Sequence, residues 1–530
     1  MIKNNCSTQL KQSASIPSEY YMKRVDRLFQ FHCIAFTHIR LLSRLSTGAT
    51  TFRRTFQSFR NSRIIFPKDE AHTMGSDHIT AAAMAIGTRT QILPIDPTKL
   101  GHFSDRSTES GMPLEDWDLK LDGTTQDGKD LQLAASNLKH SDIPVAFPTE
   151  TVYGLGADAT RSAAVKGIYK AKQRPSDNPL IVHIASLKQL RRLISVSNSP
   201  SDIDPIPQIY HPLIRRFWPG PITIILPVPE DSKLAPEVTA GLRTFGARMP
   251  RDLLALALIK TADVPVAAPS ANASTKPSPT AAEHVRYDLD GRIEWIVDGG
   301  PCDVGVESTV VDGLNSPPAV LRPGGIGIDL IRTVPGWEDT VVGYHDVSMK
   351  GDAAPRAPGM KYRHYSPKAP VMLVEATGGK QPSSSDLARQ LGSSGSVGLV
   401  RTKKWKRMGD GAAKGEVAGE VASLESTPKG AGTSASPLEA MLQETSRHKK
   451  QLHAEEVIIG HGGKPFTVWD MCIGPDTASV ARGLFSALRE LDRKDVDAII
   501  VEGIDDEEGD IAAAVMNRLR KAAEVKLEQL

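Results

Sequence analysis

Cysteine is scarce in this sequence, with four residues among 530. Cys6, Cys33, Cys302 and Cys472 lie far apart and form no C-x-x-C pair. This spacing argues against a structural zinc site and against a disulfide framework. We therefore expect a protein that needs no zinc and works in a reducing compartment.

Net charge is also small. The 64 Lys and Arg residues nearly balance the 62 Asp and Glu residues, which gives a formal charge of +2. Nothing in this balance demands a nucleic acid or an anionic membrane as partner, so any recognition of anions must be local. With 40% apolar and 24% charged residues, the chain has the composition of a soluble globular protein. Its length predicts two or three domains.

Several common catalytic motifs are missing. The sequence contains no G-x-x-x-x-G-K-[ST], no H-E-x-x-H, no G-x-S-x-G and no G-x-G-x-x-G between a predicted strand and helix. These absences exclude, at the level of motif, a P-loop nucleotide site and the enzyme classes that the other patterns mark.

The first 75 residues differ in composition from the rest. Eight arginines stand among many Ser and Thr, and Glu19 and Asp26 are the only acids before Asp69. This composition is typical of a transit peptide, but a disordered basic tail, or sequence upstream of a start at Met74, fits as well. We expect a cytoplasmic protein, with this arm as a candidate signal for mitochondria. The apolar stretch 28–42 is interrupted by His and Arg and is too short to span a bilayer.

The remaining chain predicts two α/β domains. Residues 76–125 have no sustained period and predict a loosely ordered lead-in. Short β-branched runs then alternate with helical stretches over 126–335, which predicts a twisted mixed sheet covered by helices. The runs are 145–147, 180–184, 222–227, 264–268, 293–297 and 308–311.

A connector rich in Gly, Pro and aromatic residues follows at 336–369. Residues 370–530 predict a smaller Rossmann-like domain, with strands at 371–374, 397–400, 457–459 and 498–501. Two helices follow apolar periods, which run through Val480, Leu484, Leu488 and Leu491 and through Ile511, Ala514, Val515 and Leu519. The stretch of about 402–450 has little apolar period and predicts a mobile insertion.

The densest chemistry lies in residues 146–183, which carry a loop of hydroxyls and glycines, then Lys172 and Arg174, then Asn178 and His183. Pro175 disfavours the helical region for Arg174, so we expect Lys172 and Arg174 in extended chain, facing one anion together. A solvated helix end favoured by the helix dipole is the alternative for the two cations. A buried core imidazole is the alternative for His183.

Three further clusters carry polar groups near strand ends. Ser270 and Asn272 follow a predicted strand, where α/β folds place ligands, although a capped turn explains them too. Arg248 lies just before Met249-Pro250. Ser308 begins a strand and Arg322 precedes Pro323. Arginines constrained by a nearby proline, at 174, 248 and 322, are hard to explain as packing alone.

Taken together, these residues resemble a known family. PTETVYGLGA, KAKQRPSDNPLIVHI, RFWPGPIT, VPVAAPSAN, DGGPCDVGVESTVVD and LRPG are similar to the YrdC-like catalytic domain of L-threonylcarbamoyl-AMP synthases. APGMKYRHYSP, LFSALRELD and MNRLRKAA resemble the two-domain type. The resemblance implies a twisted α/β sheet with a concave positive cleft, joined to a Rossmann-like domain. It also implies a nucleotidyltransferase that converts L-threonine, bicarbonate and ATP into L-threonylcarbamoyl-AMP and pyrophosphate, for the threonylcarbamoyladenosine of tRNAs that read ANN codons.

The resemblance also assigns residues. In the ATP site, the resemblance implies that Lys172 and Arg174 contact the phosphates and act in catalysis. Asn178 is implied to support them. The other residues implied to hold the nucleotide are Thr244, Ser270, Asn272, Ser278 and Arg322. The residues implied to bind L-threonine are Thr149, His183, Arg248, Ala268 and Ser308. Tyr362 is implied to close over the nucleotide as a lid, together with His364. Mg²⁺ is expected to accompany ATP. The implied partner is a transferase that passes the threonylcarbamoyl group to tRNA, with at most weak RNA contact and no membrane.

Two other functions use a similar fold. One is a carbamoyltransferase of the hydrogenase-maturation type, but those proteins carry C-x-x-C zinc pairs, which this sequence lacks. The other is binding of double-stranded RNA or assistance in ribosome assembly, against which the near-neutral charge argues.

Overall fold

The described part of the computed structural model comprises residues 89–105, 111–174, 178–195, 203–344, 364–391, 395–408, 437–445, 453–461, 464–509 and 511–526. All of them belong to one unit, Gly87–Leu530. The Arg-rich arm, Tyr362 and most of the predicted insertion lie outside these residues.

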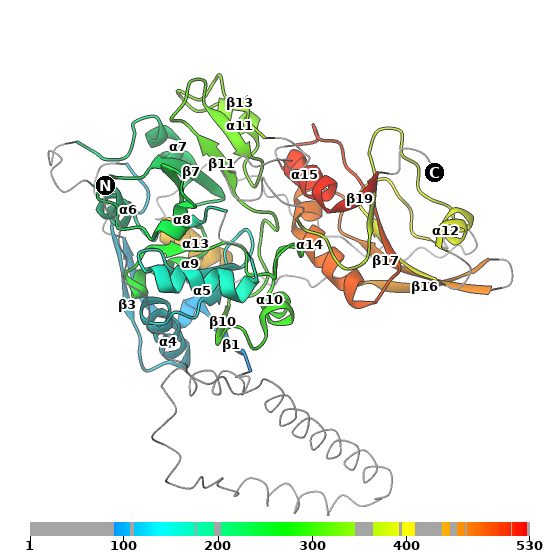
Figure 1. Ribbon diagram of the computed structural model, residues 1–530, viewed down its shortest axis with the longest axis horizontal. Helices are drawn as coiled ribbons and strands as arrows, with labels where there is room; N and C mark the ends of the chain where they lie inside the picture. Colours follow the sequence, from blue (N-terminus) through cyan, green and yellow to red (C-terminus); the bar gives the residue numbers. More distant parts are fainter. Residues whose placement is uncertain are drawn as a thin grey trace, which may run out of the picture. The chain divides into compact units, whose positions relative to one another are not determined.

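A mixed sheet forms the framework of the first domain (Figure 1). Parallel and antiparallel pairs alternate irregularly along it, as predicted for 126–335. In spatial order its eleven described strands are β1 (Gln91–Pro94), β10 (Trp295–Asp298), β4 (Val145–Phe147), β5 (Gly154–Asp158), β9 (Val266–Ala267), β6 (Ile181–His183), β8 (Thr244–Arg248), β7 (Ile222–Pro227), β11 (Thr309–Asp312), β12 (Ala319–Arg322) and β13 (Val341–Val342).

Helices cover this sheet. Leu253 to Ile259 of α9 are all buried, because that helix is apolar on every side and therefore runs through the interior. Asp252 caps its first turn by accepting a hydrogen bond from the Ala255 N–H. The helices are α4 (Gln126–His140), α5 (Ser162–Lys172), α6 (Leu187–Ile194), α7 (Tyr210–Phe217), α8 (Pro236–Thr239), α9 (Leu253–Ala262), α10 (Ala282–Leu289) and α11 (Ile328–Arg332). No helix in the described ranges is both long and apolar enough to cross a membrane.

The predicted loose lead-in is instead part of the first domain wherever it is described. β1 forms the edge of the main sheet, and the short helix η2 (Pro97–Lys99) leads into a hairpin of β2 (Gly101–Asp105) and β3 (Trp117–Leu121). Trp117 is fully buried and its indole N–H donates to the Ala185 carbonyl at 2.7 Å. No apolar period marks this segment in the sequence, because a few large side chains, rather than a regular stripe, anchor it.

The second domain contains a six-stranded sheet, parallel except for one edge strand. Its strands, in spatial order, are β16 (Glu455–His461), β17 (Lys464–Cys472), β15 (Ser396–Arg401), β18 (Ala498–Glu502), β14 (Val371–Val374) and β19 (Ala523–Lys526). Its helices are α12 (Ser384–Leu391), α14 (Thr477–Arg493) and α15 (Ala512–Ala522). The α14 residues Val480, Leu484, Leu488 and Leu491 are all buried, as their period predicts. This arrangement agrees with the predicted Rossmann-like domain.

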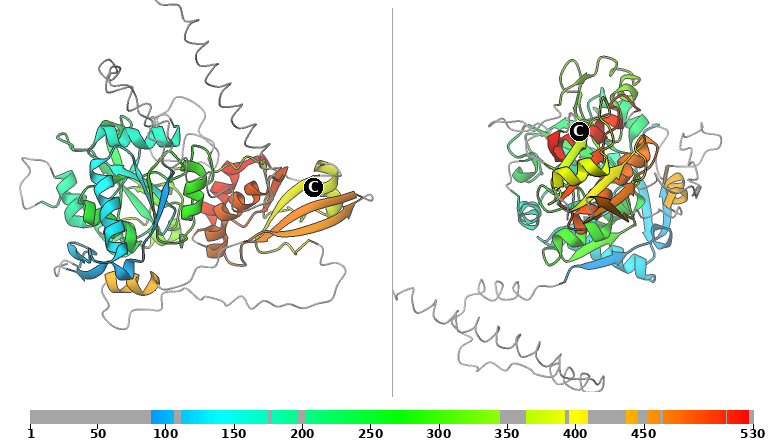
Figure 2. Two further views of the ribbon diagram at one scale, coloured as in Figure 1. Left: turned by 90° about the horizontal axis from the view of Figure 1, so that it is seen from below. Right: turned by 90° about the vertical axis from the view of Figure 1, so that its right-hand side faces the viewer.

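Part of the predicted mobile insertion at 402–450 is described and forms regular structure. Residues 437–445 form helix α13 (Pro437–Thr445), whose Leu438 and Met441 are buried in the apolar core of the first domain. Figure 2 shows this orange helix beside the blue N-terminal elements. Two apolar side chains on a helix of nine residues are too few to stand out as a period in the sequence.

The two domains meet through α14 and α15 (Figures 1 and 2). Gly305 approaches α14 so closely that a Cβ at this position would lie 2.4 Å from the Arg482 Cα, and its φ of +79° also favours glycine. Thr280 and Ser486 share a hydrogen bond of 2.9 Å between their hydroxyls.

The predicted connector divides between the two domains. Trp337 is buried against Tyr210, so the first residues of the connector belong to the first domain. Its last residues belong with the second domain, because Asp492 of α14 accepts from the N–H groups of Lys368 and Ala369.

Candidate active site

A cavity opens where the large sheet meets the last part of the connector. The space between its walls, including the part that is open to solvent, amounts to about 710 Å³. Loops supply most of its walls, and three strand ends contribute polar or charged side chains: His183 ends β6, Arg248 ends β8 and Arg322 ends β12. His183 and Arg248 are direct partners across the parallel pair β6 and β8.

Most of the predicted site residues line this cavity. They are Thr149, Arg174, His183, Arg248, Ala268, Ser270, Asn272, Ser278, Ser308, Arg322 and His364. Lys172, Asn178 and Thr244 are not among the lining residues. Thr244 begins β8, four residues before Arg248, so its contact with ATP stays a prediction. Tyr362 lies outside the described residues, and its role as a lid stays a prediction too.

Each nitrogen of the Arg248 guanidinium has an acceptor beside it. Its Nη1 donates to the Thr151 hydroxyl at 2.9 Å, its Nε to the Gly220 carbonyl at 3.3 Å, and its Nη2 lies 2.7 Å from Oε1 of Glu150. Both charged side chains are buried. The guanidinium is therefore fixed in direction, with its charge balanced from behind by Glu150, which does not line the cavity.

His183 is a neutral imidazole. Burial, with help from Arg248, lowers the pKa of His183 to about 3. Its ring packs edge-on against Phe147, and its Nδ1 has no hydrogen-bond partner among the described residues. A buried polar atom without a partner calls for an explanation, and a ligand in the adjoining cavity would provide one.

The hydroxyl loop after β4 is internally bonded. The Thr149 hydroxyl donates to the Val152 carbonyl at 2.6 Å and lies 2.8 Å from the Thr151 hydroxyl. It also accepts from the N–H of Val152 at 3.2 Å. Thr149 thus shapes the loop that presents Thr151 to Arg248.

The predicted extended clamp of Lys172 and Arg174 is wrong. Lys172 is the last residue of α5, and Gln173 adopts the left-handed conformation with φ 53°. Arg174 then bonds back through its N–H to the Tyr169 carbonyl at 3.0 Å. The helix closes with a left-handed cap, so Lys172 and Arg174 do not face the same side of an extended chain.

Lys172 points instead into the loop that carries Ser270. Its ammonium donates to the Ser270 carbonyl and, at 2.7 Å, to the Asn272 carbonyl. Burial, followed by the nearby Arg174, holds the pKa of Lys172 well below its usual value. Ser270 in turn donates to the Asn272 side-chain oxygen at 2.5 Å. Lys172 therefore supports the loop, while Arg174 lines the cavity.

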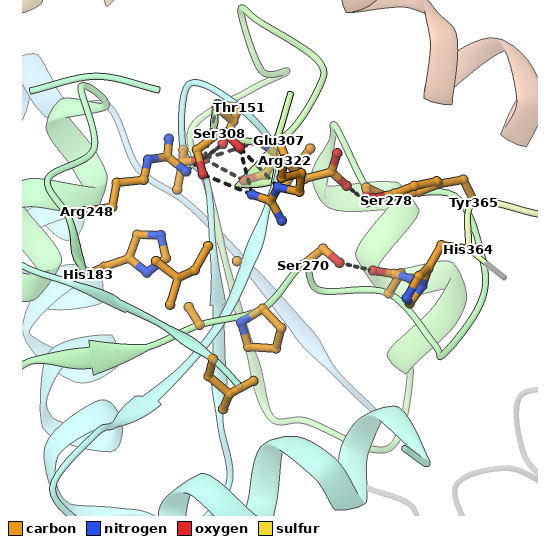
Figure 3. A pocket seen from close by; sticks show the side chains of 18 of the residues that line it. Thr151, His183, Arg248, Ser270, Ser278, Glu307, Ser308, Arg322, His364 and Tyr365 are labelled. Atoms are coloured by element: carbon orange, nitrogen blue, oxygen red, sulfur yellow. Dashed lines mark hydrogen bonds between the residues drawn. The ribbon is translucent and has the colours of Figure 1, made fainter. Parts of the chain in front are cut away.

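Arg322 lies in the middle of the cavity wall. Its Nη2 donates to the Ser308 carbonyl at 2.8 Å and to the Ser308 hydroxyl at 3.1 Å. Burial lowers the pKa of Arg322 to about 10, which still leaves it charged at neutral pH. In Figure 3, Arg248 and His183 lie at one end of the cavity and Ser270 and His364 toward the other, with Arg322 between them.

The connector closes one side of the cavity with two aromatic rings. Burial, followed by the nearby Arg174, lowers the pKa of His364 to about 3. Tyr365 stacks on Phe485 of α14 with ring centres 5.2 Å apart. Burial and the neighbouring Glu307 raise the pKa of Tyr365 to about 12. His364, which the resemblance implied to be a lid residue, and its neighbour Tyr365 thus both line the cavity, and the lid role stays a prediction.

Several cavity residues were missed by the sequence reasoning, among them Thr151, Glu307, Lys276 and Tyr365. Glu307 stands directly before Ser308, two residues ahead of a strand that is buried along its length. An acidic residue beside a buried strand is a signal that it is paired, and this signal was available in the sequence.

Family models match most of the described region, from residue 138 onward. Residues 138–324 match the Sua5/YciO/YrdC model described as "Telomere recombination". Residues 329–524 match the model described as "Threonylcarbamoyl-AMP synthase, C-terminal domain".

Known proteins match over both domains. The threonylcarbamoyl-AMP synthase of Schizosaccharomyces pombe is 42% identical over 83% of this chain and 98% of its own length. The chain belongs to the threonylcarbamoyl-AMP synthase family. The Bacillus subtilis member is 41% identical over 74% of this chain and 92% of its own length. The crystal structure of Pyrococcus abyssi Sua5 complexed with L-threonine superposes with a TM-score of 0.53 at 36% identity, over 75% of this chain and 96% of that one.

Membership in the threonylcarbamoyl-AMP synthase family decides between the functions that the sequence left open. The relatives that match both domains carry the synthase name, rather than that of an RNA-binding protein or a hydrogenase-maturation enzyme. The family also accounts for the order of the domains, with the catalytic fold before the Rossmann-like one.

Proposed function

We propose that this protein makes L-threonylcarbamoyl-AMP and pyrophosphate from L-threonine, bicarbonate and ATP. The observation that carries the proposal is one cavity with two chemically different ends. A fixed arginine and small hydroxyls form one end, and cations with Ser and Asn side chains form the other. The names of the two-domain relatives support the same reaction.

Threonine fits the end that contains Arg248. A fixed guanidinium suits a carboxylate, which it binds through two parallel hydrogen bonds. The uncharged His183 can exchange a hydrogen bond with the substrate without adding a second charge. Ala268 keeps the wall small beside these polar groups, and the P. abyssi protein was crystallised with L-threonine.

ATP fits the other end. Arg174 and Arg322 supply positive charge toward the cavity, and Ser270, Asn272 and Ser278 supply hydrogen-bonding groups. Lys172 contributes by holding the Ser270 loop, because its ammonium is already bound to two carbonyls there.

The reaction needs positioning more than a side-chain nucleophile. Threonine's amine and bicarbonate give a carbamate and water. A carbamate oxygen then attacks the α-phosphorus, the bond from that phosphorus to the β-phosphate oxygen breaks, and pyrophosphate leaves. Arg322, between the two ends, is placed to stabilise the charge that develops at the transferred phosphoryl group.

Magnesium is proposed to enter with ATP. Mg²⁺ commonly binds through substrate phosphates and one or two carboxylates rather than in a cage of protein ligands. In the described residues no three His, Cys, Asp or Glu side chains gather closely enough to hold a metal alone. Its chemistry would be to neutralise phosphate charge. That the protein needs no zinc stays a prediction.

The reactivity of the product indicates which kind of enzyme must act together with this protein. A threonylcarbamoyl adenylate is a mixed anhydride that water destroys, so an enzyme that transfers the acyl group to an adenosine amine of tRNA must consume it. We propose such a transferase as the partner of this protein in the cell.

Pyrophosphate release tests the function directly. Purified protein with ATP, bicarbonate and threonine should release pyrophosphate, and leaving out either threonine or bicarbonate should stop the release. Protein that released none under any of these conditions, yet bound duplex RNA tightly, would contradict the synthase and support an RNA-binding role.

The location in the cell is a separate proposal. The Arg-rich first 75 residues support a fraction in mitochondria beside a cytoplasmic one. Tagged full-length protein should show both locations, and a product begun at Met74 only the cytoplasm. Identical distributions would show that the arm is not a signal.

A further inference from the structure

Arg518 of α15 is a fully buried guanidinium that crosses from the second domain into the first. Its Nε donates to Oε2 of Glu307 at 3.0 Å, and its Nη1 donates to the Pro323 carbonyl at 2.6 Å. It also lies over the ring of Tyr365, 5.9 Å from the ring centre. A buried cation is expensive unless it is paired, so these contacts hold Arg518 in one place.

Both acceptors stand next to residues that line the cavity. Glu307 directly precedes Ser308, and Pro323 directly follows Arg322. Ser308 directly precedes β11 and Arg322 ends β12, and these two strands pair antiparallel. One rigid, planar guanidinium therefore ties together the two points of the chain that present Ser308 and Arg322.

Glu307 in turn holds Ser278 through a hydrogen bond. Its Oε1 lies 2.6 Å from the Ser278 hydroxyl, on the opposite side of the carboxylate from Arg518. Burial alone would raise the pKa of Glu307, but Arg518 and Arg322 lower it to about 2. The carboxylate is therefore ionised and can only accept hydrogen bonds. Ser278 must donate its one proton to Glu307.

This direction of donation limits what Ser278 can recognise. Toward the cavity, its oxygen offers only lone pairs, so it can accept a hydrogen bond but cannot donate one. A phosphate oxygen of ATP carries no proton to give at neutral pH. A ribose hydroxyl or the amino group of the base does.

We propose that Arg518 is a positioning residue for the nucleotide: through Glu307 it makes Ser278 an acceptor for a ribose hydroxyl or the base amino group, and through Pro323 it fixes Arg322. The proposal rests on the proposed ATP site. It gives the second domain a share in substrate recognition, in addition to packing.

Kinetics of Arg518→Met test the proposal. Methionine keeps much of the apolar volume and removes the charged fork. We expect the KM for ATP to rise about tenfold or more, as for the loss of one charge-assisted contact, while the KM for threonine changes less than about twofold. Arg520→Met is the matched control, because Arg520 lies on the same helix and pairs with Glu375 and Asp506 of its own domain.

A double variant separates positioning from stability. Arg518→Met alone leaves the Glu307 charge buried with fewer partners, and this should lower the Tm. Arg518→Met with Glu307→Gln removes both charges and should recover much of the Tm. The KM for ATP should nevertheless stay high, because Ser278 is no longer oriented. If Arg518→Met fails to fold, the KM values for ATP and threonine are measured instead for the double variant and for Arg518→Lys.

ATP analogues identify the donor group. Wild type should use one of 2′-deoxy-ATP, 3′-deoxy-ATP or the triphosphate of purine riboside, which lacks the amino group, about tenfold less well than ATP. Ser278→Ala and Arg518→Met should both lose that discrimination.

Two results would overturn the inference in an active wild type: Arg518→Met kinetics equal to those of Arg520→Met, or discrimination that survives in both variants. A double variant that recovers its KM for ATP together with its Tm would reduce Arg518 to a stabilising residue. Wild-type protein without any pyrophosphate release would instead contradict the proposed function.

Discussion

Individual side chains in this cavity are fixed before any substrate arrives. Arg248 already has the Thr151 hydroxyl, the Gly220 carbonyl and the Glu150 carboxylate as neighbours. Its orientation therefore costs no entropy at the moment of binding, which is the usual benefit of preorganisation. A flexible ammonium cannot reproduce that fork.

Arg248→Lys should consequently raise the KM for threonine about 10- to 100-fold and leave the KM for ATP nearly unchanged. Steady-state pyrophosphate release at varied threonine and at varied ATP measures both constants. Arg243→Lys, in an exposed residue beyond the far end of the same strand, is the control. An equal rise in both constants would show that Arg248 supports the whole cavity rather than threonine.

The sequence predicted such residues unevenly. Hydroxyls and arginines beside prolines, such as Ser270, Arg248 and Arg322, could be found because turn chemistry marks them locally. Arg518 could not be found, because an arginine between the apolar positions of a helix is usually interpreted as exposed to solvent. In addition, its partner Glu307 is 211 positions away in the sequence. Local rules carry no information about contacts over that separation.

The end of α5 and the loop after β9 act as a single element. Lys172, whose ammonium is buried, joins them through the carbonyls of Ser270 and Asn272. Removing the ammonium would leave the buried Asn272 carbonyl and the half-buried Ser270 carbonyl without their donor, at up to about 1–3 kcal/mol each.

Lys172→Met should therefore lower the Tm by roughly 5–10 °C and raise the KM for ATP about tenfold. A thermal melt and the pyrophosphate assay give the two values. Lys170→Met changes an exposed lysine of the same helix and should alter neither. Lost activity with an unchanged Tm would mean that Lys172 contacts ATP directly, as the family resemblance implied.

Strands were predicted well where consecutive residues are buried. The strands at 145–147, 222–227 and 371–374 coincide with the predicted ones, since β-branched runs bounded by turns leave few alternatives. Helix α13 and the β2–β3 hairpin were not found, because each is anchored by a few large side chains such as Trp117 and Met441.

Across the part of the chain that the structure describes, three imidazoles are buried and neutral. Burial is the first cause in each case, and it lowers the pKa of His183 and of His364 to about 3 and that of His284 to about 2. The unfolded chain takes up these protons below a pH of about 6.5, whereas the folded chain does not. Above that pH the buried histidines therefore do not lower the free energy of unfolding. As the pH falls toward 3, the free energy of unfolding decreases progressively, because only the unfolded chain binds these protons.

Each such histidine contributes a slope of up to about 1.4 kcal/mol per pH unit below pH 6. His284→Gln should therefore make the Tm less dependent on pH between 7 and 5.5. His140→Gln, in an exposed residue at the end of α4, should follow the wild type. Calorimetric melts at the two pH values measure the difference, and parallel losses in all three proteins would contradict this origin of acid sensitivity.

Helix α13 also has a consequence for the order of events on the ribosome. The first domain's core includes Trp337, but it is complete only with Leu438 and Met441, which are made about 100 residues later. At roughly 5–20 residues per second, that interval is on the order of 5–20 s. During this time the nascent first domain carries an unfinished apolar surface. A chaperone that shields it until translation passes Met441 should raise the yield of folded enzyme more than one that acts only after release.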